Sequence, residues 1–365
     1  HPRAWLGGNV GRSPLALLPE RVQRDESKGA ALQLRRAPIV LELSSFLLHN
    51  FDGIKKSPHI AVLTNLFPDH LNAYSSLQKY FADKKNIYRY QKRGDFLIIN
   101  DDDALLKKLA PASKGVELRF SLRRKVRSGC YVEKGRVVFC HSGASEASDR
   151  IQLNFGSYRP AGQGSRMTEE TVCKLSDLKL PGEHNLYNLL AAVCAAKAYG
   201  ISNAAIRRAV KKFRGVPYRL ELARTVRGVR YINDTTATTP EGAVAGLRSF
   251  PKKKIILITG GNSKGLSLVQ FSKEIRARAK MVILLPGNAN KDLPKGIKIP
   301  PLPLGERVGV RGGGAAMREA VRVASENATR GDVVLLSPGL SWLPVMNEFE
   351  RGDEFVKWVK FDIRK

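Results

Sequence analysis

Short apolar runs separated by helical patterns fill the first part of the chain. The runs PIVLELSSFLL at 38–48 and PHIAVLTNLF at 58–67 are bounded by proline or polar residues. Continuous apolar runs of this length are typical of buried parallel strands. Between 75 and 91 the apolar side chains recur at helical spacing, which predicts a helix with Ser75 or Ser76 as its N-cap.

A more varied pattern follows this helix. FLIIN at 96–100 predicts a further short strand, and residues 115–180 alternate weakly among many turn residues, which predicts a small, mostly β region. The run PGEHNLYNLLAAVCAAKAYG at 181–200 predicts a helix that begins after Pro-Gly and stops at a glycine. A second helix is expected at about 202–213.

Beyond a Gly- and Pro-containing segment at 214–221, the pattern becomes that of an open α/β sheet. Four short apolar strands alternate with helical stretches, and their sequences are VRYIND, KKIILITGG, MVILLPG and GDVVLLSPG. Their carboxyl ends would line one edge, where such sheets bind ligands. We therefore expect two domains, 1–215 and 216–365, and a surface loop at the Pro/Gly-rich stretch 300–314.

The composition is that of a globular protein with an unusual charge. Apolar residues make up 43% of the 365, and the formal net charge is +29 with a pI near 10.2. The basic residues form short clusters scattered along the chain, which favours a solvated basic surface over a specific nucleic-acid site. A basic α/β nucleic-acid-binding protein stays open as an alternative class.

The cysteines and the length of the apolar runs bear on the compartment. The four cysteines show no CxxC spacing, which argues against a structural zinc site and against disulfides. A reducing, cytoplasmic compartment fits this usage best. No apolar run approaches the roughly 20 residues of a membrane span, so no membrane insertion is expected.

Three residues near the first two predicted strands suggest a metal site. Glu42 ends one strand, His70 follows Asp69 in the loop after the next, and Lys84 lies on the following helix. Taken singly, Glu42 would equally cap the following turn. A histidine beside an aspartate, as at His70, is more typical of a surface pair than of a ligand, and a helical lysine such as Lys84 is more typical of a solvated face. Together they offer a carboxylate, an imidazole and a lysine to a divalent metal beside a phosphate-bearing substrate.

A set of ordered motifs resembles the Mur ligases, the ATP-dependent amide-bond-forming enzymes of peptidoglycan synthesis, and above all their D-glutamate-adding members. The motifs are LELSSF, TNLFPDHLN, FADKKNIY, LPGEHNLYNLLAA, FRGVPYRLE, YINDTTATTPE, GGNSKG, LLSPG and NEFERGDEF. The resemblance covers nearly the whole chain from Gly7 onward. It implies an incomplete central P-loop-type ATPase domain with a mostly parallel sheet, followed by a Rossmann-like C-terminal domain that binds the incoming amino acid.

The resemblance implies a role for each candidate residue of the first domain. Glu42 and His70 match magnesium ligands. Lys84 matches a lysine that the family carbamylates, which converts a cation into an oxygen-donating anion. Asn9 in GGNVG matches the turn that contacts the muramoyl substrate, and Asn188 in PGEHNLYN matches an asparagine that reads ATP.

The resemblance also implies roles in the second domain. Arg219 and Asp234 match residues that reach the nucleotide, and a guanidinium suits phosphate because it is planar and always charged. Lys264 in GGNSKG and Ser337 in LLSPG match residues that receive the carboxylates of D-glutamate. The sequence departs from the family pattern at Thr236, where many members carry lysine, and after SPG, where one residue is deleted and an aromatic contact is missing.

One element of the family is not found. Phosphoryl transfer normally uses a G-x-x-x-x-G-K-[ST] loop, and the 365 residues contain no Gly-Lys dipeptide. In the family this loop lies upstream of the GGNVG turn. We therefore expect an N-terminally truncated sequence that lacks the first domain and the start of the second, and that is inactive alone.

The implied reaction uses ATP and Mg²⁺ to join D-glutamate to UDP-N-acetylmuramoyl-L-alanine through an acyl phosphate. We expect a cytoplasmic monomer with no specific nucleic-acid partner. Another Mur ligase or a folylpolyglutamate synthetase would share Glu42, His70 and Lys84, so these stay open as alternatives within the same class.

Overall fold

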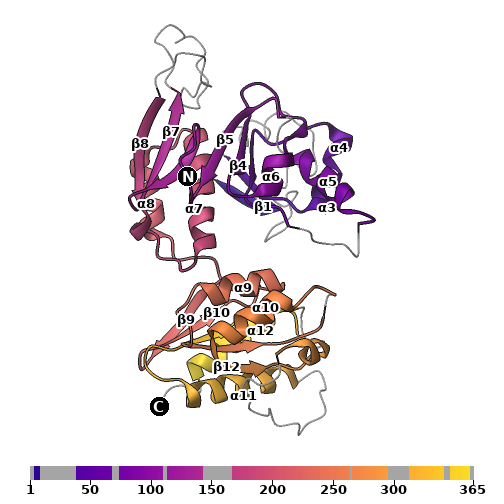
Figure 1. The fold of residues 1–365 in the computed structure, drawn as a ribbon, viewed down its shortest axis with the longest axis vertical. Coiled ribbons are helices and arrows are strands. Elements are labelled where there is room, and N and C mark those ends of the chain that lie inside the picture. Colours follow the sequence, from indigo (N-terminus) through magenta and orange to yellow (C-terminus); the bar gives the residue numbers. More distant parts are fainter. Residues whose placement is uncertain are drawn as a thin grey trace, which may run out of the picture. The chain divides into compact units, whose positions relative to one another are not determined.

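The chain forms two compact units, shown as ribbons in Figure 1. The N-terminal unit contains residues 1–174 and 187–206, and the C-terminal unit contains residues 175–186 and 207–365. The short segment 175–186 groups with the C-terminal unit although it precedes the predicted hinge. The computed structural model describes residues 4–8, 38–67, 74–109, 113–142, 167–263, 265–294, 312–340 and 346–361.

The N-terminal unit is built around two sheets. Its strands are β1 (Trp5–Gly8), β2 (Ile39–Glu42), β3 (Ile60–Leu63), β4 (Phe96–Asn100), β5 (Val116–Ser121), β6 (Gly129–Glu133), β7 (Arg136–Ser142) and β8 (Met167–Lys174). Its helices are α3 (Ser45–His49), α4 (Phe51–Ile54), α5 (Leu77–Arg89) and α6 (Ala104–Leu109). Two further helices, α7 (Glu183–Ala198) and α8 (Asn203–Lys212), have residues in both units.

The larger sheet of this unit has the order β3-β4-β5-β6-β7-β8. Strands β3 to β6 pair in parallel, and β7 and β8 add to the sheet in antiparallel fashion. All five residues of β4 are buried, as expected for a central parallel strand. The predicted strand at 96–100 and the β region within 115–180 are confirmed. The strand predicted at 58–67 is present as β3, which is shorter and only partly buried.

The three helices predicted at 75–91, 181–200 and about 202–213 are confirmed as α5, α7 and α8. The Ser76 side chain accepts a hydrogen bond from the Lys79 amide at the start of α5. Helix α7 ends before Gly200, which adopts a left-handed conformation (φ 81°) that an L-residue avoids. All four cysteines, Cys130, Cys140, Cys173 and Cys194, are free and buried in this unit, which bears out the expectation of no disulfide.

The predicted buried strand at 38–48 was wrong in length and in burial. Strand β2 ends at Glu42, and all four of its residues are exposed. It pairs in parallel with β1 in a separate two-stranded sheet. The apolar residues that follow form helix α3, because the Ser44 side chain caps it by accepting a hydrogen bond from the Leu47 amide.

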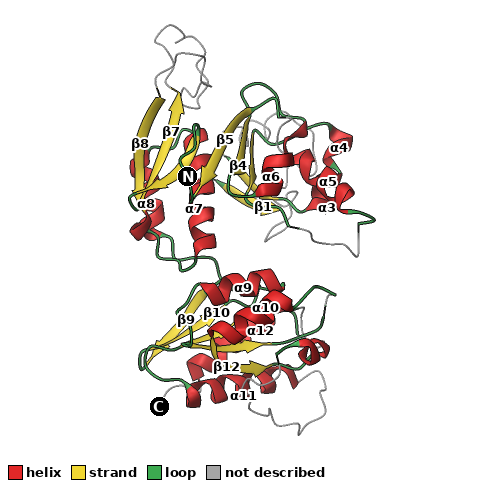
Figure 2. Ribbon diagram, in the orientation of Figure 1, coloured by secondary structure: helices red, strands yellow, loops and turns green. Residues whose placement is uncertain are grey.

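The C-terminal unit is an open α/β sheet with helices on both faces (Figure 2). Its strands are β9 (Glu221–Val226), β10 (Val229–Asn233), β11 (Ile255–Thr259), β12 (Ala279–Leu284) and β13 (Val333–Leu336). Its helices are α9 (Pro240–Arg248), α10 (Val269–Arg278), α11 (Gly312–Asn327) and α12 (Glu348–Phe361), with short 3₁₀ turns at η3 (Leu175–Asp177) and η4 (Asn288–Asp292). The four predicted strands are confirmed, and β9 adds an edge strand that the pattern did not reveal.

The order of this sheet is β12-β11-β13-β10-β9, with only β9 antiparallel to its neighbour. One apolar core joins the sheet to α11 and α12, and another joins its opposite face to α9 and α10. The strands β11 and β13 contribute to both cores because successive side chains point to opposite faces. Parallel order places the carboxyl ends of β10, β11, β12 and β13 at one edge.

Candidate functional site

The loop after β10 carries the best-defined polar cluster of the C-terminal unit. The Asp234 carboxyl group accepts a hydrogen bond from the Ser337 hydroxyl at 2.9 Å and another from the Leu220 amide at 3.1 Å. It therefore links two other chain segments, the 216–220 segment before β9 and the loop after β13. Gly246 of α9 lies so close that a Cβ there would meet an Asp234 oxygen at 2.7 Å.

Asp234 has an unusual protonation equilibrium. Its side chain is buried, with the residue only 6% exposed, and this burial raises its pKa to about 7 although the Ser337 and Leu220 hydrogen bonds and the charge of Arg219 act in the opposite direction. A carboxyl group with this pKa changes its charge near neutral pH. Such groups are concentrated at functional sites, so Asp234 is a candidate on physical grounds as well as by its motif.

A buried arginine fixes the same loop from the other side. Arg351 of α12 is fully buried, and its guanidinium donates to the Thr235 hydroxyl oxygen at 2.9 Å and to the Thr235 carbonyl at 2.8 Å. The Thr235 hydroxyl donates in turn to the Glu348 carbonyl at 2.7 Å. The loop that carries Asp234 is thereby held by α12.

Burial of the guanidinium lowers the pKa of Arg351 to about 10, while nearby Glu348 raises it, so the group stays charged at neutral pH. Its Nη1 atom has no hydrogen-bond partner among the residues that the structure describes. Neither Arg351 nor Thr235 was singled out from the sequence. The sequence signal that could have revealed Arg351 is a charged residue in FERGDEF at a position on the apolar face of a helix.

The segment before β9 places Arg219 beside this loop. Tyr218 and Leu220, on either side of it, adopt left-handed backbone conformations (φ 66° and 45°), which L-residues rarely take. The Arg219 side chain is exposed, and its charge acts on Asp234. Thr236 donates from both its amide and its hydroxyl to the Tyr218 carbonyl, so the residue that replaces the family lysine ties the two segments together.

The start of α7 contributes a histidine to the C-terminal unit. Partial burial of His184 lowers its pKa, and the positive charge of Arg219 adds to this effect, so the imidazole is neutral at neutral pH. Gly182 precedes it with a φ of 94°, and a Cβ there would approach the His184 ring within 2.6 Å. Asn188, one turn further along α7, is exposed and belongs to the N-terminal unit.

One small depression in the C-terminal unit is lined by residues of three of the quoted motifs. It is lined by Thr238, Pro240, Ser263, Leu266, Leu268, Gly339 and Leu340. Ser263 directly precedes Lys264, which lies outside the described residues, and Gly339 follows Ser337 closely. Ser337 itself is fully buried, and its hydroxyl proton is donated to Asp234. The structure thus brings the TTPE, GGNSKG and SPG motifs together.

In the N-terminal unit, two predicted segments meet at the ends of β1 and β2. Gly8 of GGNVG lies opposite Glu42 in the parallel ladder, and a Cβ on Gly8 would overlap the Glu42 carbonyl oxygen at 2.0 Å. This close approach requires glycine. Asn9, the next residue, lies outside the described residues, so its predicted substrate contact stays a prediction.

Lys84 lies on the second turn of α5, partly exposed, with its Nζ 5.5 Å from the centre of the Tyr80 ring. A cation over an aromatic face is stabilised by the ring quadrupole. The carboxylate of its neighbour Asp83 lies 3.1 Å from Nδ1 of His49, and this contact ties α5 to α3. His70 lies outside the described residues.

Of the three predicted magnesium ligands, the structure describes Glu42 and Lys84 but not His70. The exposed carboxylate of Glu42 ends a strand and offers the oxygen ligands that Mg²⁺ prefers. Among the residues that the structure describes, no three His, Cys, Asp or Glu side chains are close enough together to hold a metal ion. The set of Glu42, His70 and carbamylated Lys84 therefore stays a prediction.

Comparison with known proteins shows which family the chain belongs to. The Mur ligase middle domain family matches residues 30–196, and the Mur ligase, glutamate ligase domain family matches residues 218–340. A protein of Pelotomaculum thermopropionicum, named UDP-N-acetylmuramoylalanine--D-glutamate ligase, is 32% identical over 365 residues, covering 99% of this chain and 69% of its own length. The chain belongs to the Mur ligase family.

Two further Mur ligase relatives carry the same name. The Roseiflexus protein is 36% identical over 324 residues, covering 88% of this chain and 65% of its own length. The Acetivibrio thermocellus protein is 33% identical over 362 residues, covering 97% of this chain and 67% of its own length. The chain thus spans about two thirds of the length of these curated relatives.

Solved structures of other Mur ligases share the fold. MurF ligase from Thermotoga maritima, in complex with ADP, aligns with 99% of this chain and 79% of its own at a TM-score of 0.58 and 14% identity. MurF from Acinetobacter baumannii aligns with a TM-score of 0.58 and 16% identity over 98% of this chain and 76% of its own. This likeness confirms the predicted α/β architecture. Within the described residues, no helix is long and apolar enough to cross a membrane.

Proposed function

We propose that this Mur ligase chain is the magnesium-binding and amino-acid-binding part of an ATP-dependent acid–D-amino-acid ligase. It adds D-glutamate to UDP-N-acetylmuramoyl-L-alanine in peptidoglycan precursor synthesis, in the cytoplasm. The observation that carries the proposal is the identity of 32–36%, over 88–99% of the chain, with relatives that all bear this name. The enzyme acts as a monomer.

The proposed reaction forms one amide bond. ATP transfers its γ-phosphoryl group to the carboxylate of the muramoyl substrate, and the amine of D-glutamate then attacks the acyl carbon and expels phosphate. Bound magnesium supplies charge neutralisation at the phosphates. Glu42, His70 and carbamylated Lys84 would hold the metal, Asn188 and Arg219 would bind the nucleotide, and Asn9 would contact the muramoyl group.

The acceptor amino acid is bound in the C-terminal unit. Lys264 supplies a positive charge for a carboxylate of the amino acid, and the residue before it in the sequence, Ser263, lines the depression together with Gly339. The Ser337 hydroxyl has one proton, which it donates to Asp234, so a carboxylate bound by Ser337 has to replace Asp234 as the acceptor. Protonation of Asp234, whose pKa is raised to about 7 by burial, makes this exchange accessible near neutral pH.

Binding of the amino acid tests the specificity without requiring catalysis. D-glutamate is titrated into the 365-residue chain by calorimetry, with L-glutamate, D-alanine, L-lysine and diaminopimelate alongside. We expect D-glutamate to bind best, Lys264→Ala to weaken it at least tenfold, and Lys252→Ala, on an exposed turn, to leave it unchanged. Equal binding of the two glutamate enantiomers, or preference for another amino acid, would contradict the D-glutamate assignment.

A second experiment tests whether the 365-residue chain catalyses the reaction by itself. We expect no phosphate release from ATP with the chain and both substrates, since the Gly-Lys phosphate loop is absent from its sequence. Phosphate release that depends on D-glutamate would overturn this expectation. The nucleic-acid alternative gains no support from the basic side chains, several of which bind neighbouring carboxylates: Arg119, Arg248 and Arg322.

A further inference from the structure

The sheet of the C-terminal unit has a second edge, opposite the carboxyl edge that carries the polar cluster. The starts of the parallel strands β10, β11, β12 and β13 lie there, together with the turn between β9 and β10, and we call it the amino edge. Backbone hydrogen bonds join its turns. The Gly331 amide donates to the Gly228 carbonyl at 3.0 Å, and the Val333 amide donates to the Lys254 carbonyl at 2.7 Å. The turns are thereby held in fixed positions relative to one another.

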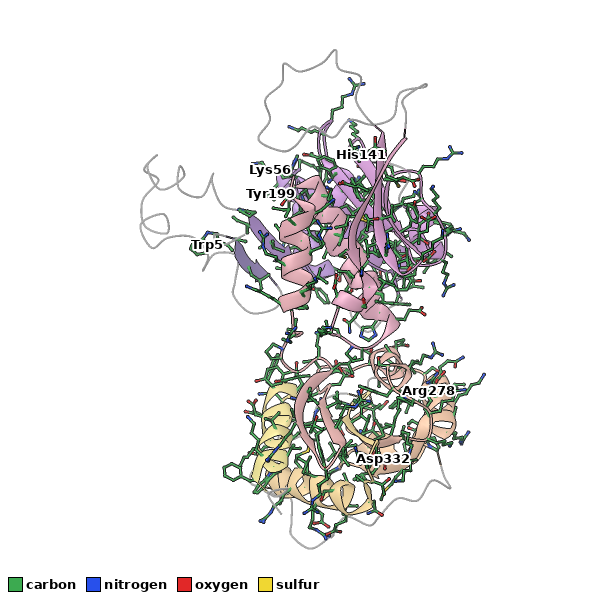
Figure 3. The ribbon with its side chains drawn as sticks, turned by 90° about the vertical axis from the view of Figure 1, so that its left-hand side faces the viewer. Trp5, Lys56, His141, Tyr199, Arg278 and Asp332 are labelled. Atoms are coloured by element: carbon green, nitrogen blue, oxygen red, sulfur yellow. The ribbon has the colours of Figure 1, made fainter. Side chains whose placement is uncertain are left out.

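Positively charged side chains are concentrated on the amino edge. They come from the β9–β10 turn and from the segments that precede β11, β12 and β13: Arg227, Arg230, Lys252, Lys253, Lys254, Arg276, Arg278, Lys280 and Arg330. Within the described part of these segments and of the adjoining helices, acidic side chains are fewer: Asp332, Glu274 and Glu326. Figure 3 labels Arg278 and Asp332 of this edge. The edge is therefore strongly basic.

Part of this charge has a structural role. Helices α10 and α11 end at the amino edge, and the carboxyl end of a helix carries a partial negative charge. Lys253 Nζ donates to the Arg276 carbonyl at 2.7 Å, and Lys280 Nζ donates to the Asn327 carbonyl at 3.2 Å. Lys280 Nζ also binds the buried Asp332 carboxylate at 2.6 Å. The fold itself therefore accounts for Lys253 and Lys280.

Other cations of the amino edge have no such role. Among the residues that the structure describes, the exposed side chains of Arg227, Lys252, Arg276 and Arg330 make no hydrogen bond and no ion pair. Arg330 packs against the β9–β10 turn, since a Cβ on Gly228 would meet its Cγ at 2.7 Å. Like charges fixed close together repel one another, and an anionic partner relieves that repulsion.

Helix α12 carries an exposed aromatic ring to the same edge. It begins beside the loop after β10, where the Glu348 carbonyl accepts a hydrogen bond from Thr235. With 14 residues it is about 21 Å long, slightly longer than β10, so it ends near the amino edge. Arg224 of β9 holds its last turn by donating to the Lys360 carbonyl at 3.1 Å. The final residue, Phe361, is 59% exposed.

We propose that the amino edge adsorbs to an anionic phospholipid membrane, with its cations at the headgroups and the Phe361 ring at the boundary with the acyl chains. A cationic surface with an exposed aromatic ring at its margin is typical of proteins that bind to a membrane without crossing it. Adsorption in this orientation leaves the opposite edge of the same sheet, with Asp234 and Ser337, accessible to ligands.

The chemistry of the edge favours a membrane over other anionic partners. The strand starts lie about 4.8 Å apart, so the five-stranded sheet presents a face about 20 Å wide, enough for several headgroups. A protein partner needs an apolar centre to bind tightly, whereas Phe361 is the one exposed large apolar side chain described at this edge. A nucleic acid bound through its bases needs several stacking rings. Electrostatic adsorption to a membrane needs neither.

Co-sedimentation with vesicles tests the proposal on the full 365-residue chain. One set of vesicles is an equimolar mixture of phosphatidylcholine and phosphatidylglycerol, and the other is phosphatidylcholine alone. At physiological salt we expect binding to the anionic vesicles to be at least tenfold stronger, and to weaken as salt is added. Hydrogen exchange on the anionic vesicles should slow at the amides of 227–230 and 252–254 and stay unchanged at 234–237.

A triple variant of the amino edge measures its contribution. It combines Arg227→Gln, Lys252→Gln and Arg330→Gln. Each cation near an anionic surface strengthens binding by about fivefold, so the loss of three should weaken binding to the anionic vesicles about a hundredfold.

A matched triple variant on α8 controls for net charge. It combines Arg207→Gln, Arg208→Gln and Lys212→Gln, which lie on exposed positions of the helix. The two triple variants have the same net charge, but the α8 variant should weaken vesicle binding by less than about threefold, because its charges lie outside the amino edge. All six side chains are exposed, so both variants should fold, and thermal unfolding checks this.

The aromatic ring separates a membrane from a nucleic acid. Phe361→Ser should weaken binding to the anionic vesicles at least threefold, since the ring leaves water only at a membrane. Its binding to duplex RNA should not change. If duplex RNA at the same phosphate concentration binds the chain more tightly than the vesicles do, and the amino-edge triple variant abolishes that binding, the occupant is a nucleic acid and the proposal is wrong.

Three other outcomes would overturn the proposal. One is equal binding to the two kinds of vesicle, and another is equal weakening by the two triple variants, which would leave only the net charge of the chain. The third is slowed exchange at 39–42 in β2, whose apolar side chains are also exposed, in place of the amino edge. No measurement involves ATP or D-glutamate, so failure here leaves the proposed ligase function to its own test.

Discussion

The two units differ in how completely their parallel strands are buried. In the C-terminal unit, β11 and β13 are buried in every residue, and helices cover both faces of a single five-stranded sheet. In the N-terminal unit, β4 is equally buried, but β2 is exposed in every residue and belongs to a sheet of its own. The described part of the C-terminal unit therefore contains one sheet that is covered on both faces, whereas the described part of the N-terminal unit contains a six-stranded sheet and a separate two-stranded sheet whose strand β2 is exposed.

This difference separates local preference from tertiary burial. The sequence IVLE of β2 is nearly as apolar as VVLL of β13, and both form parallel strands. Strand β13 has partners on both sides, with β11 on one edge and β10 on the other. An apolar run is thus enough to specify a strand, while its contribution to stability depends on the neighbours that cover it.

Truncating one isoleucine in each unit should give the largest difference in the loss of unfolding free energy. Ile258→Ala in β11 removes a fully buried side chain and should cost about 4 kcal/mol of unfolding free energy in the C-terminal unit. Ile39→Ala in β2, at a position 46% exposed, should cost less than about 1 kcal/mol in the N-terminal unit. Hydrogen exchange in urea, followed at amides of each unit, measures the unfolding free energy of the two units separately. Equal losses would show that β2 is covered in solution.

A titration of the buried carboxyl group gives the next largest effect. The pKa of Asp234 is raised to about 7 by burial, so the folded state binds a proton more tightly than the unfolded state does. The stability that this provides is present below about pH 4 and is lost as the pH rises toward 7. Between about pH 5 and about pH 8 the C-terminal unit should lose about 2.5 kcal/mol through this group.

Asp234→Asn should remove this pH dependence, as followed by urea unfolding at several pH values. Asp332 of the same unit serves as the control. Its burial raises its pKa, but hydrogen bonds from Lys280 and Thr329 and the charge of Lys280 lower that pKa overall. Its contribution has the opposite sign: it is present at neutral pH and lost on acidification. An Asp234→Asn variant with an unchanged pH profile would contradict the assignment.

A pair of helical glycines gives the smallest contrast. Gly352 of α12 faces the loop after β10, and a Cβ there would lie 2.6 Å from Thr235 Cγ2 and 2.7 Å from Tyr218 Cδ1. Gly352→Ala should therefore cost about 2 kcal/mol in the C-terminal unit. A Cβ on Gly53 of α4 would meet no atom of the described residues within 4 Å, so Gly53→Ala should be neutral or stabilise the N-terminal unit by up to about 1 kcal/mol.

Hydrogen exchange, measured separately for the amides of each unit, gives the change in unfolding free energy of both glycine variants. A neutral Gly352→Ala would mean that the loop after β10 is free to move away from α12. That result would also argue against Arg351 fixing this loop, because Arg351 acts on the loop through its hydrogen bonds to Thr235, the residue that a Cβ on Gly352 would displace.

Sequence reasoning succeeded where local patterns were decisive. The capped helix α5, the strands β3 and β4 and the four parallel strands of the C-terminal unit all follow from periodicity and turn residues. It failed at 38–48, because an apolar run does not reveal that Ser44 will cap a helix inside it. It also missed β9, whose weakly apolar sequence ELARTV depends on pairing with β10.

The site was predicted less completely for a similar reason. Ordered motifs pointed to Asp234 and Ser337, and the structure joins them by one hydrogen bond. Arg351 and Thr235 were missed, since their importance comes from a contact across 116 positions of sequence. Nor does a sequence show that burial raises the pKa of Asp234, because this effect depends on the atoms that surround the carboxyl group.

The distribution of cysteine makes the two units distinguishable by chemistry alone. All four thiols of the chain lie in the N-terminal unit, all are buried, and the C-terminal unit has none in its sequence. Burial raises the pKa of the Cys140 thiol to about 11, so the reactive thiolate is scarce while this unit stays folded. An alkylating reagent would therefore count openings of the N-terminal unit only, in the unmodified protein and without an introduced label.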